Sequence, residues 1–333
     1  MTFAARLDDL EAVAIAAAGE MRAAVLPALG RANARVAVGV APGGDVTMAI
    51  DELAEDALER AVERTGNLAY YSEDRGLVEF GAPRAILIVD PVDGTRPAAA
   101  GFEACCASVA VVPPDHSATL GDVAIGVVQE LRSGTTFIGR RGAGTRMVDA
   151  GGTSRSASLS SNHALQALFV GASNRARPLV PLAIVLEEMV DGAAMQGGYF
   201  ELGSATFAMT RVVTGQLDAY VDPGHRMLCE LPLLESEFRR VAGGTIATNF
   251  PYDVAAATLV VAEAGGMVTD AAGGSLDPVP AVGSGEGFGL SVVATASAAL
   301  HEAVLGAIDR GIQRLRATLQ TPGPGRAASP AGA

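Results

Sequence analysis

The stretch AILIVDPVDGT, residues 85–95, constrains the fold of this chain more than any other. Its first five residues are apolar and mostly β-branched, which predicts a buried strand. The strand ends in Asp90 and Asp93, followed by Gly94 and Thr95, in a turn that contains a proline. An isolated buried carboxylate costs several kcal/mol unless something neutralises it. The fold must therefore compensate two carboxylates at this strand end.

The bulk composition limits the classes of protein to consider. With 333 residues, 49% of them hydrophobic and 18% charged, the chain is long enough for two domains or one large one with a substantial core. The net charge of −13 without an arginine-rich block argues against a nucleic-acid partner. The N-terminus lacks the apolar region of a signal peptide, and no segment reaches the length of a membrane span. We expect a soluble cytoplasmic protein with no membrane partner.

Cysteine and histidine residues carry no recognisable metal-binding spacing. We expect the cysteines to be buried small apolar residues in a reducing compartment, namely Cys105, Cys106 and Cys229. We expect ordinary surface histidines at His116, His163 and His301.

Hydrophobic periodicity predicts two halves of different texture. Helices are expected at 3–28, from Asp51 to about 66, at 178–192, at 253–266 and from Ser297, with Ser204 capping another. Strands are expected at 35–40, 85–89, 106–112, 123–130, 134–139, 167–171, 217–221 and 290–295. Residues 1–155 form an N-terminal α+β half and residues 156–315 a C-terminal α/β half. The Pro/Gly/Ala-rich tail, residues 316–333, is expected to be disordered.

Acidic residues recur at four places where a strand ends or a helix begins. These are Asp45 with Asp51 around Thr47, Glu73 with Asp74, Asp90 with Asp93, and Asp253. A general acid and base would explain two carboxylates but not four, because crowded like charges repel one another. Three or four carboxylates with a backbone carbonyl are the oxygen ligands that Mg²⁺ prefers, and Mg²⁺ keeps positions open for water and phosphate. If the four places converge, they form a magnesium site.

The motifs, taken in order, resemble those of the inositol monophosphatase family. This family belongs to a superfamily of lithium-sensitive, Mg²⁺-dependent sugar phosphatases that includes fructose-1,6-bisphosphatases and bisphosphate nucleotidases. The matching segments are GDVTMAID (44–51), YSEDRG (71–76), DPVDGT (90–95), ELGSATFAMTRVVTGQLDAYVD (201–222) and PYDVAAATLVVAEAGGMVTD (251–270). Tyr252 replaces the usual Trp, and the first and fourth segments look closest to archaeal and bacterial inositol/fructose-bisphosphate phosphatases. The resemblance implies a layered αβαβα fold, of α+β and α/β character, with the active site between the two halves.

The resemblance also assigns roles to individual residues. Glu73, Asp90 and the carbonyl of Val92 would hold one Mg²⁺, and Asp90, Asp93 and Asp253 a second. Two such ions stabilise both the attacking and the leaving oxygen of a displacement. Thr95, oriented by Asp51, would position the attacking water, and Glu73 would help to take its proton. Substrate contacts are implied for Gly94, Thr95, Arg96, Ser204, Asp222 and Arg226, and supporting positions or a third ion for Asp45, Thr47 and Asp74.

Simpler roles compete with several of these assignments. Asp90 and Asp93 could form only an Asx-turn, and Glu73 could be an exposed loop acid. Asp253 could be only a helix N-cap, and Asp222 could only end a strand. Arg96 could face solvent.

Two departures from the family pattern concern the substrate. Arg96, Pro97 and Ala98 stand where an Asn and a Phe usually follow DGT. The interval 223–251 is longer than usual, and it is expected to form a specificity wall, a lid or a subunit contact. Arg226 in this interval also matches a Gly-x-Arg of archaeal-type members.

The expected function is a Mg²⁺-dependent phosphomonoesterase, acting as a homodimer on a small polyol, sugar or nucleotide phosphate. The motifs do not select among inositol 1-phosphate, fructose 1,6-bisphosphate, histidinol phosphate and adenosine bisphosphate. The alternative is a non-catalytic or repurposed member that binds or transforms a phosphorylated pathway intermediate through residues 223–251. The intact set Glu73, Asp90, Asp93, Thr95 and Asp253 favours the enzyme.

Overall fold

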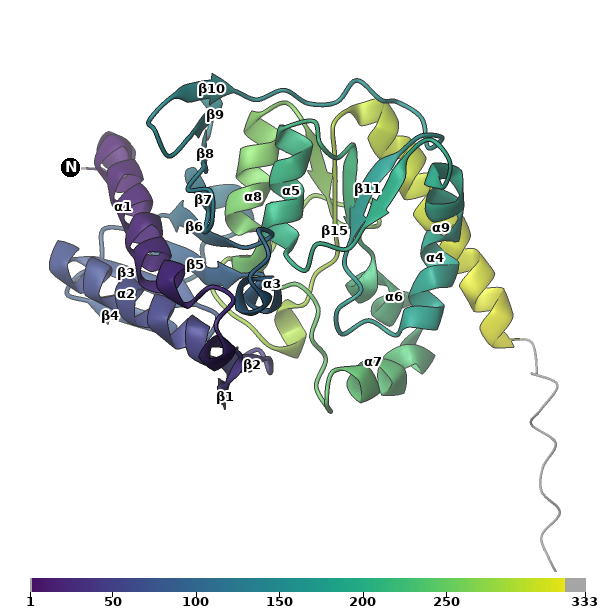
Figure 1. Ribbon diagram of the computed structural model, residues 1–333, viewed down its shortest axis with the longest axis horizontal. Coiled ribbons are helices and arrows are strands. Elements are labelled where there is room, and N and C mark those ends of the chain that lie inside the picture. Colours follow the sequence, from purple (N-terminus) through teal and green to yellow (C-terminus); the bar gives the residue numbers. More distant parts are fainter. Residues whose placement is uncertain (1, 321–333) are drawn as a thin grey trace, which may run out of the picture.

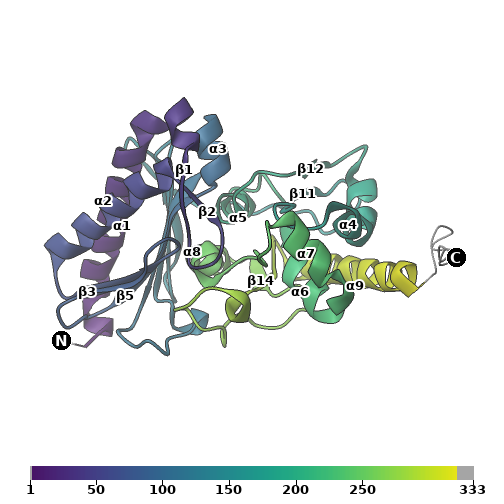
Figure 2. The same ribbon diagram turned by 90° about the horizontal axis from the view of Figure 1, so that it is seen from below.

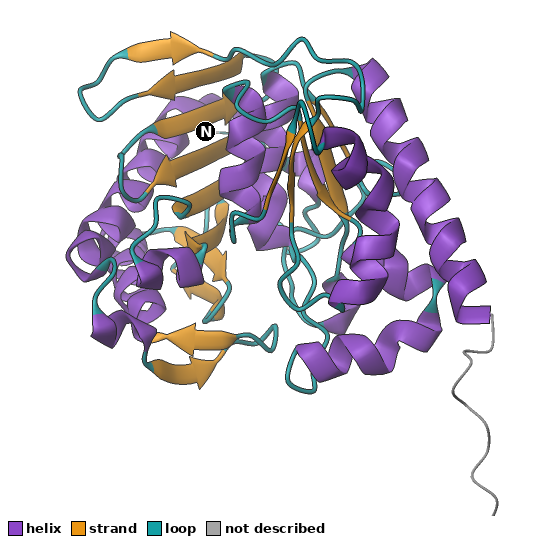
Figure 3. Cartoon of the chain, turned by 45° about the vertical axis from the view of Figure 1, so that its right-hand side comes forward, coloured by secondary structure: helices purple, strands orange, loops and turns teal. Residues whose placement is uncertain are grey.

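The chain folds into five layers, in the order helices, sheet, helices, sheet, helices (Figure 1). The computed structural model describes residues 2–320. This arrangement confirms the layered αβαβα architecture expected from the sequence. Figure 3 shows the two sheets as separate sets of arrows, with helices between them and on both outer sides.

The first sheet has eight strands in the order β10-β9-β8-β7-β6-β5-β3-β4. Only β3 and β5 run parallel; every other neighbouring pair is antiparallel. Its strands are β3 (Leu68–Ser72), β4 (Gly76–Phe80), β5 (Ile86–Asp93), β6 (Cys106–Val112), β7 (Ile125–Glu130), β8 (Thr136–Arg140), β9 (Gly144–Val148) and β10 (Ser154–Ser156).

Strand β5 is buried throughout because helices cover both faces of its sheet, and its first four residues are apolar. Its side chains alternate between the two faces. Leu87 and Val89 belong to the core cluster beneath α1 (Leu7–Val25) and α2 (Ala49–Thr65). Ile86 and Ile88 belong to the cluster on the opposite face, beneath α5 (Ala205–Val213) and α8 (Pro251–Glu263). The alternation thus joins the first three layers.

The second sheet has five strands in the order β12-β11-β13-β15-β14. They are β11 (Phe169–Ala172), β12 (Gly198–Phe200), β13 (Ala219–Asp222), β14 (Met267–Thr269) and β15 (Val292–Thr295). Strand β11 is parallel to β12 and β13, and β15 is antiparallel to β13 and β14. Helices α4 (Leu179–Ala193) and α9 (Ala298–Gln320) pack together on its outer side around a third core cluster.

Three smaller elements lie near the junction of the two sheets. A hairpin of β1 (Ala37–Val40) and β2 (Val46–Met48) stands apart from both sheets (Figure 2). The six-residue helix α3 (Thr95–Ala100) follows β5 directly, and α6 (Gly224–Glu230) and α7 (Glu235–Val241) follow β13. The long interval 223–251 is therefore largely helical.

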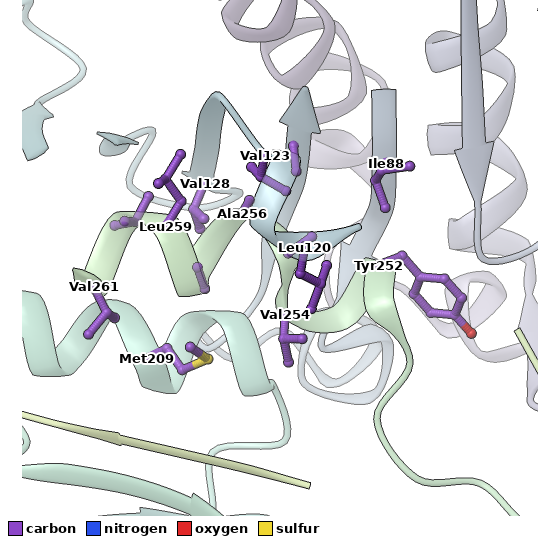
Figure 4. Packing of buried hydrophobic residues seen from close by; sticks show 14 of the residues in the cluster. Ile88, Leu120, Val123, Val128, Met209, Tyr252, Val254, Ala256, Leu259 and Val261 are labelled. Atoms are coloured by element: carbon purple, nitrogen blue, oxygen red, sulfur yellow. The ribbon is translucent and has the colours of Figure 1, made fainter. Parts of the chain in front are cut away.

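Helix α8 is the centre of the middle layer (Figure 4). It contacts five strands of the first sheet, β5 to β9, as well as α5 and β14 of the second half. Its Val254, Ala256 and Leu259 lie in one buried cluster with Ile88 and Val128. Close contact needs small residues on the sheet: a Cβ at Gly126 would lie 2.5 Å from the carbonyl oxygen of Ala256.

Most predicted elements are present, and several expectations were wrong. Strands β3 and β4, on either side of Glu73, were not predicted, nor were β2, β9, β10, β12 and β14. Residues 316–320 belong to α9, because its apolar face continues to Leu315; the rest of the predicted tail lies outside the described residues. His301 is buried, since its ring bonds to the hydroxyls of Thr269 and Thr295. Cys229 is exposed, while Cys105 and Cys106 are buried as predicted.

Across residues 2–320, none of the helices combines the length and the apolar character that crossing a bilayer requires.

The contact between α8 and the first sheet yields a stability prediction. Gly126→Ala should lower the free energy of unfolding by about 1–3 kcal/mol, because the new methyl group meets helix backbone that cannot move aside. Urea denaturation measures it. Gly287→Ala is the matched control: that glycine has open space around it, so a change within about 0.5 kcal/mol is expected. Equal effects of the two substitutions would contradict this account of the packing.

Candidate active site

A cleft partly open to solvent lies where the end of β5 meets α5, α8 and the loop after β11. Carboxylates of Glu73, Asp93 and Asp253 reach it from the first three layers, and Arg175 and Arg177 from the second half. Its remaining lining residues are Asp45, Ser173, Ala176, Gly203, Ser204, Ala205, Ala247, Thr248, Asn249, Phe250 and Tyr252. Each of the four predicted acidic places therefore contributes a residue to the lining of the cleft. Asp51 and Asp90 do not line it and are buried.

The DPVDGT turn is held in one conformation by its own backbone. The Val92 amide donates to Asp90 Oδ1 at 3.1 Å, so the Asx-turn considered as an alternative is present. Gly94 has φ +88°, in the left-handed region that favours glycine. A Cβ there would also lie 2.6 Å from the carbonyl oxygen of Ala104. The glycine of the motif is thus required by its conformation and by its surroundings.

Two of the acids occupy equivalent positions at helix starts. Asp51 is the third residue of α2 and accepts a hydrogen bond from the Met48 amide at 2.7 Å. Asp253 is the third residue of α8 and accepts from the Phe250 amide at 2.5 Å. Each side chain closes the first turn of its helix through Oδ2. Asp253 therefore caps α8 from the third position of the helix. It is not the N-cap residue, which is Phe250.

Helix α5 supplies the donors that fix Asp93. The Oδ2 atom of Asp93 accepts from the Ser204 hydroxyl at 2.7 Å and from the Thr206 amide at 2.6 Å. Ser204 caps α5 as predicted, accepting from the Phe207 amide at 3.0 Å. The Thr206 hydroxyl donates to the backbone carbonyl of Asp253 at 2.5 Å. One helix start thus ties two acidic positions together, and the Ser204 hydroxyl contacts Asp93 and the Phe207 amide.

The acids lie close enough to perturb one another. Burial is the main cause that raises the pKa of Asp90 and Glu73, and each repels the other and both Asp93 and Asp253. Burial likewise raises the pKa of Asp51 to about 7, although hydrogen bonds from Met48 and Thr95 act in the opposite direction. A compact group of five acids therefore lies at this point with too little positive charge to stabilise its ionised form.

The chemistry of this group fits a divalent cation better than a proton-transfer pair. All its donors are oxygens, and the carbonyl of Val92 lies beside them, accepting from the Thr95 hydroxyl at 3.2 Å. Within residues 2–320, however, no three His, Cys, Asp or Glu side chains are arranged around a point where an ion would sit. Asp90, Asp93 and Asp253 each direct one carboxylate oxygen to a protein donor.

A second group of acids supports the loop that carries Glu73. Thr47 donates to Asp74, and the Asp74 amide donates to Glu55 Oε1 at 3.3 Å. Glu55 is buried on α2, one turn after Asp51, and burial raises its pKa to about 7. The sequence reasoning missed Glu55. The available signal was an acid on the apolar face of the helix, between Ala54 and Leu58.

Two arginines of the loop after β11 were also missed, because no motif marks SNRAR (173–177). Arg177 is buried and forms an ion pair with Asp222 through two nitrogens. Its Nε lies 3.3 Å from Asp222 Oδ1, and its Nη2 donates to Asp222 Oδ2. Asp222 also accepts from Asn249 Nδ2 at 2.8 Å and from the Gly224 amide at 2.9 Å. Its side chain is fully buried. The structure therefore surrounds Asp222 with protein partners, and its contact with substrate stays a prediction.

Arg226 likewise does not line the cleft. It pairs with Glu230 and with Asp309 of α9, and donates to the carbonyl of Ala271 at 2.6 Å. These contacts join α6 to α9, on the far side of the second sheet from the acids. Arg96 remains near the predicted position: its guanidinium lies 3.2 Å from Asp45 and within electrostatic reach of Glu73 and Asp51.

Comparison with known proteins assigns the chain to a family. The sequence profile described as the inositol monophosphatase family matches residues 6–313, and the chain belongs to this family. The chain is 29% identical over 301 residues to a fructose-1,6-bisphosphatase/inositol-1-monophosphatase from Methanothermobacter thermautotrophicus, covering 88% of this chain and 94% of that relative. It is 24% identical over 274 residues to a bifunctional NADP phosphatase/NAD kinase from Methanococcus maripaludis, covering 79% of this chain and 43% of that relative.

Solved structures agree at the level of the fold. The Thermotoga maritima IMPase superposes with a TM-score of 0.65 at 20% identity, covering 93% of this chain and 99% of that one. The family and the named activities of the relatives make this chain an enzyme of the phosphatase class.

The buried ion pair yields the second prediction. Arg177→Met should lower the free energy of unfolding by about 3–5 kcal/mol, because Asp222 would stay buried without its cation. Urea denaturation measures the loss, and Asp222→Leu in the Arg177→Met background should recover most of it. Arg226→Met is the control, expected to cost about 1 kcal/mol or less because Asp309 and Glu230 reach solvent. A stable Arg177→Met protein with only a raised KM would restore the predicted substrate role of Asp222.

The buried acids predict an unusual pH dependence of stability in the metal-free protein. The pKa of Asp51 and of Glu55 rises to about 7 in the folded state, so the folded chain holds more protons than the unfolded chain between roughly pH 4 and 7. Stability should be greatest below this window and fall as the pH rises through it. We expect the Tm in EDTA to drop by on the order of 5 °C from pH 5 to pH 8.

Thermal denaturation at four pH values in EDTA measures this fall. Glu55→Gln removes one of the titrating groups and should flatten the slope. A Tm that rises over the window, or the same slope in the variant, would show that the acids are compensated in a way the described contacts do not explain.

Proposed function

We propose that this phosphatase is a Mg²⁺-dependent phosphomonoesterase acting on small sugar or polyol phosphates. The observation that carries the proposal is the group of five mutually repelling acids beside the Thr95 hydroxyl, at the bottom of an open cleft. Neither a proton-transfer pair nor a simple turn needs so many acids in one place.

Glu73, Asp90, Asp93, Asp253 and the carbonyl of Val92 would hold the metal ions, two by resemblance to the family and a third if Asp74 also takes part. Bound Mg²⁺ would neutralise the acids and polarise the phosphate ester. Such binding explains how a chain of charge −13 can accept an anion in this cleft.

The chain's own residues would orient the reaction. The Thr95 hydroxyl acts on the Asp51 carboxyl against the burial that raises its pKa, which supports a role for this pair in positioning the attacking water. Glu73, whose pKa burial raises, would accept the proton from that water. The amides of Gly94 and Thr95, fixed by the left-handed turn, would bind phosphate oxygens.

The end of the long interval would shape the substrate pocket. Ala247, Thr248, Asn249 and Phe250 line the cleft and lead directly into Asp253. This supports the expected specificity wall over a subunit contact for this part of the segment. The relatives' names, which include bisphosphate, inositol phosphate and dinucleotide phosphatases, leave the ester itself to be measured. Inhibition by lithium and a homodimeric state are further parts of the proposal, from the family resemblance.

Phosphate release from a panel of esters tests the function. Inositol 1-phosphate, fructose 1,6-bisphosphate, histidinol phosphate and adenosine bisphosphate would each be incubated with Mg²⁺ and with EDTA. We expect release only with Mg²⁺, and a loss of at least about 10³-fold in kcat for Asp93→Asn, because an acid that must face the metal is neutralised.

Arg60→Gln, on the exposed side of α2, is the control and should keep full activity. Release that persists in EDTA would contradict the metal dependence. No release from any ester, in a folded protein that binds Mg²⁺, would favour the alternative of a repurposed member acting through residues 223–251.

A further inference from the structure

We infer that Ser108 is a positioning residue for Asp90: its hydroxyl supplies a hydrogen bond that holds the Asp90 carboxylate in place when that carboxylate binds a metal ion. The inference rests on the proposed function, because it concerns the Mg²⁺ site, and it adds a residue that lies outside the family motifs. The observations behind it are the register of two strands, a buried hydroxyl without a partner and the small number of donors around Asp90.

Ser108 lies directly beside Asp90 in the first sheet. Strands β5 and β6 are antiparallel neighbours, and their register places Ser108 opposite Asp90, just before the pairing becomes irregular. Side chains alternate between the two faces of a sheet, and Ile88 of β5 belongs with Cys106 and Ala110 of β6 to the cluster beneath α5 and α8. Asp90 and Ser108 therefore point to that same face. Residues directly opposite each other have Cβ atoms about 4.5–5.5 Å apart, which is within reach of a hydroxyl and a carboxylate.

The Ser108 hydroxyl has no partner of its own. The residue is fully buried, and within residues 2–320 its Oγ forms no hydrogen bond, either with Asp90 or with any other group. A buried hydroxyl without a partner is uncommon, because burial removes the water that would otherwise satisfy it. Serine turns about a single side-chain bond, so this hydroxyl can be redirected while the strand stays in place. The structure thus keeps an unused donor beside Asp90.

Asp90 has fewer donors than the acid that follows it in the same motif. Asp93 accepts two hydrogen bonds from the start of α5, which anchor it to a second element. In the described part of the chain, Asp90 accepts one hydrogen bond, from the Val92 amide of its own turn. Carboxylates that bind metal ions are generally oriented by hydrogen bonds from groups around them. Ser108, on the neighbouring strand, is the group placed to anchor Asp90 in this way.

Ser108 could instead be needed only because it is small. Helix α8 packs on β6 as well as on β7, where it requires the small residue Gly126. If size alone matters, alanine replaces Ser108 without any effect on metal binding. If the hydroxyl holds Asp90, alanine removes an unsatisfied group from the metal-free protein and a necessary donor from the metal-bound protein. The positioning role therefore predicts weaker metal binding without a loss of stability in the absence of metal.

The experiment compares Ser108→Ala with the unmodified chain. Isothermal titration calorimetry with MgCl₂ gives the Kd for Mg²⁺, and thermal denaturation in EDTA gives the Tm of the metal-free protein. We expect the Kd to rise by about tenfold or more, because groups that orient metal ligands contribute by that factor. The Tm in EDTA should stay equal or rise by up to about 3 °C, since the hydroxyl has no partner to lose. At saturating Mg²⁺ the KM for the preferred ester should stay within about twofold.

Thr258→Val is the matched control. Within the described residues the Thr258 hydroxyl is also buried without a partner, but it lies on α8, more than one turn beyond Asp253. This variant should therefore leave the Kd for Mg²⁺ unchanged.

A Kd that Ser108→Ala leaves unaltered would overturn the positioning role and leave Ser108 as a small residue beneath α8. A higher Kd that comes with a lower Tm in EDTA, or that Thr258→Val reproduces, would also overturn it, because the packing of α8 would then be the cause. Both results leave the proposed function intact, since the unmodified protein still binds Mg²⁺. If the unmodified protein binds no Mg²⁺, the proposed function fails, and the positioning role fails with it.

Discussion

Like charges crowded at the end of one buried strand are the constraint around which this molecule is organised. Asp90 and Asp93 cannot leave the interior, because β5 lies in the middle of an eight-stranded sheet covered on both faces. Glu73, Asp51 and Asp253 come to the same place from three other elements. A fold that gathers five acids in this way is destabilised by them unless cations join, and within residues 2–320 Asp90 forms no ion pair with an arginine. The energetic cost is the clearest sign of what the site binds.

The groups that restrain these acids also build the fold. Asp51 and Asp253 each close the first turn of a helix, and Ser204 caps α5 while donating to Asp93. A carboxylate that is already bonded to backbone loses less freedom when it binds an ion. The site is oriented by its helix starts and would be completed by its ligand.

Sequence reasoning selected the motif acids that the structure brings together, but it did not select the arginines beside them. Asp90, Asp93 and Asp253 were found because strand ends and helix starts leave a local pattern, and their order along the chain resembles a known family. Arg175 and Arg177 were missed because their role depends on a strained turn and on partners 45 or more residues away, such as Asp222. Asp222 and Arg226 were assigned to substrate by position in a motif. Their actual partners, a buried arginine and the last helix, are set by tertiary packing that no local pattern encodes.

The position of α8 has a consequence for how the chain becomes active. This helix comes from the last third of the sequence, yet it packs on strands formed by residues 86–140 and carries Asp253 to them. Contacts of such long sequence separation form late, since a large loop must close first. During synthesis, one face of the first sheet therefore stays uncovered and its group of acids stays incomplete until α8 packs on it. Completion of the group of acids and burial of the central core then become one event, so the site is assembled only when the chain has finished folding.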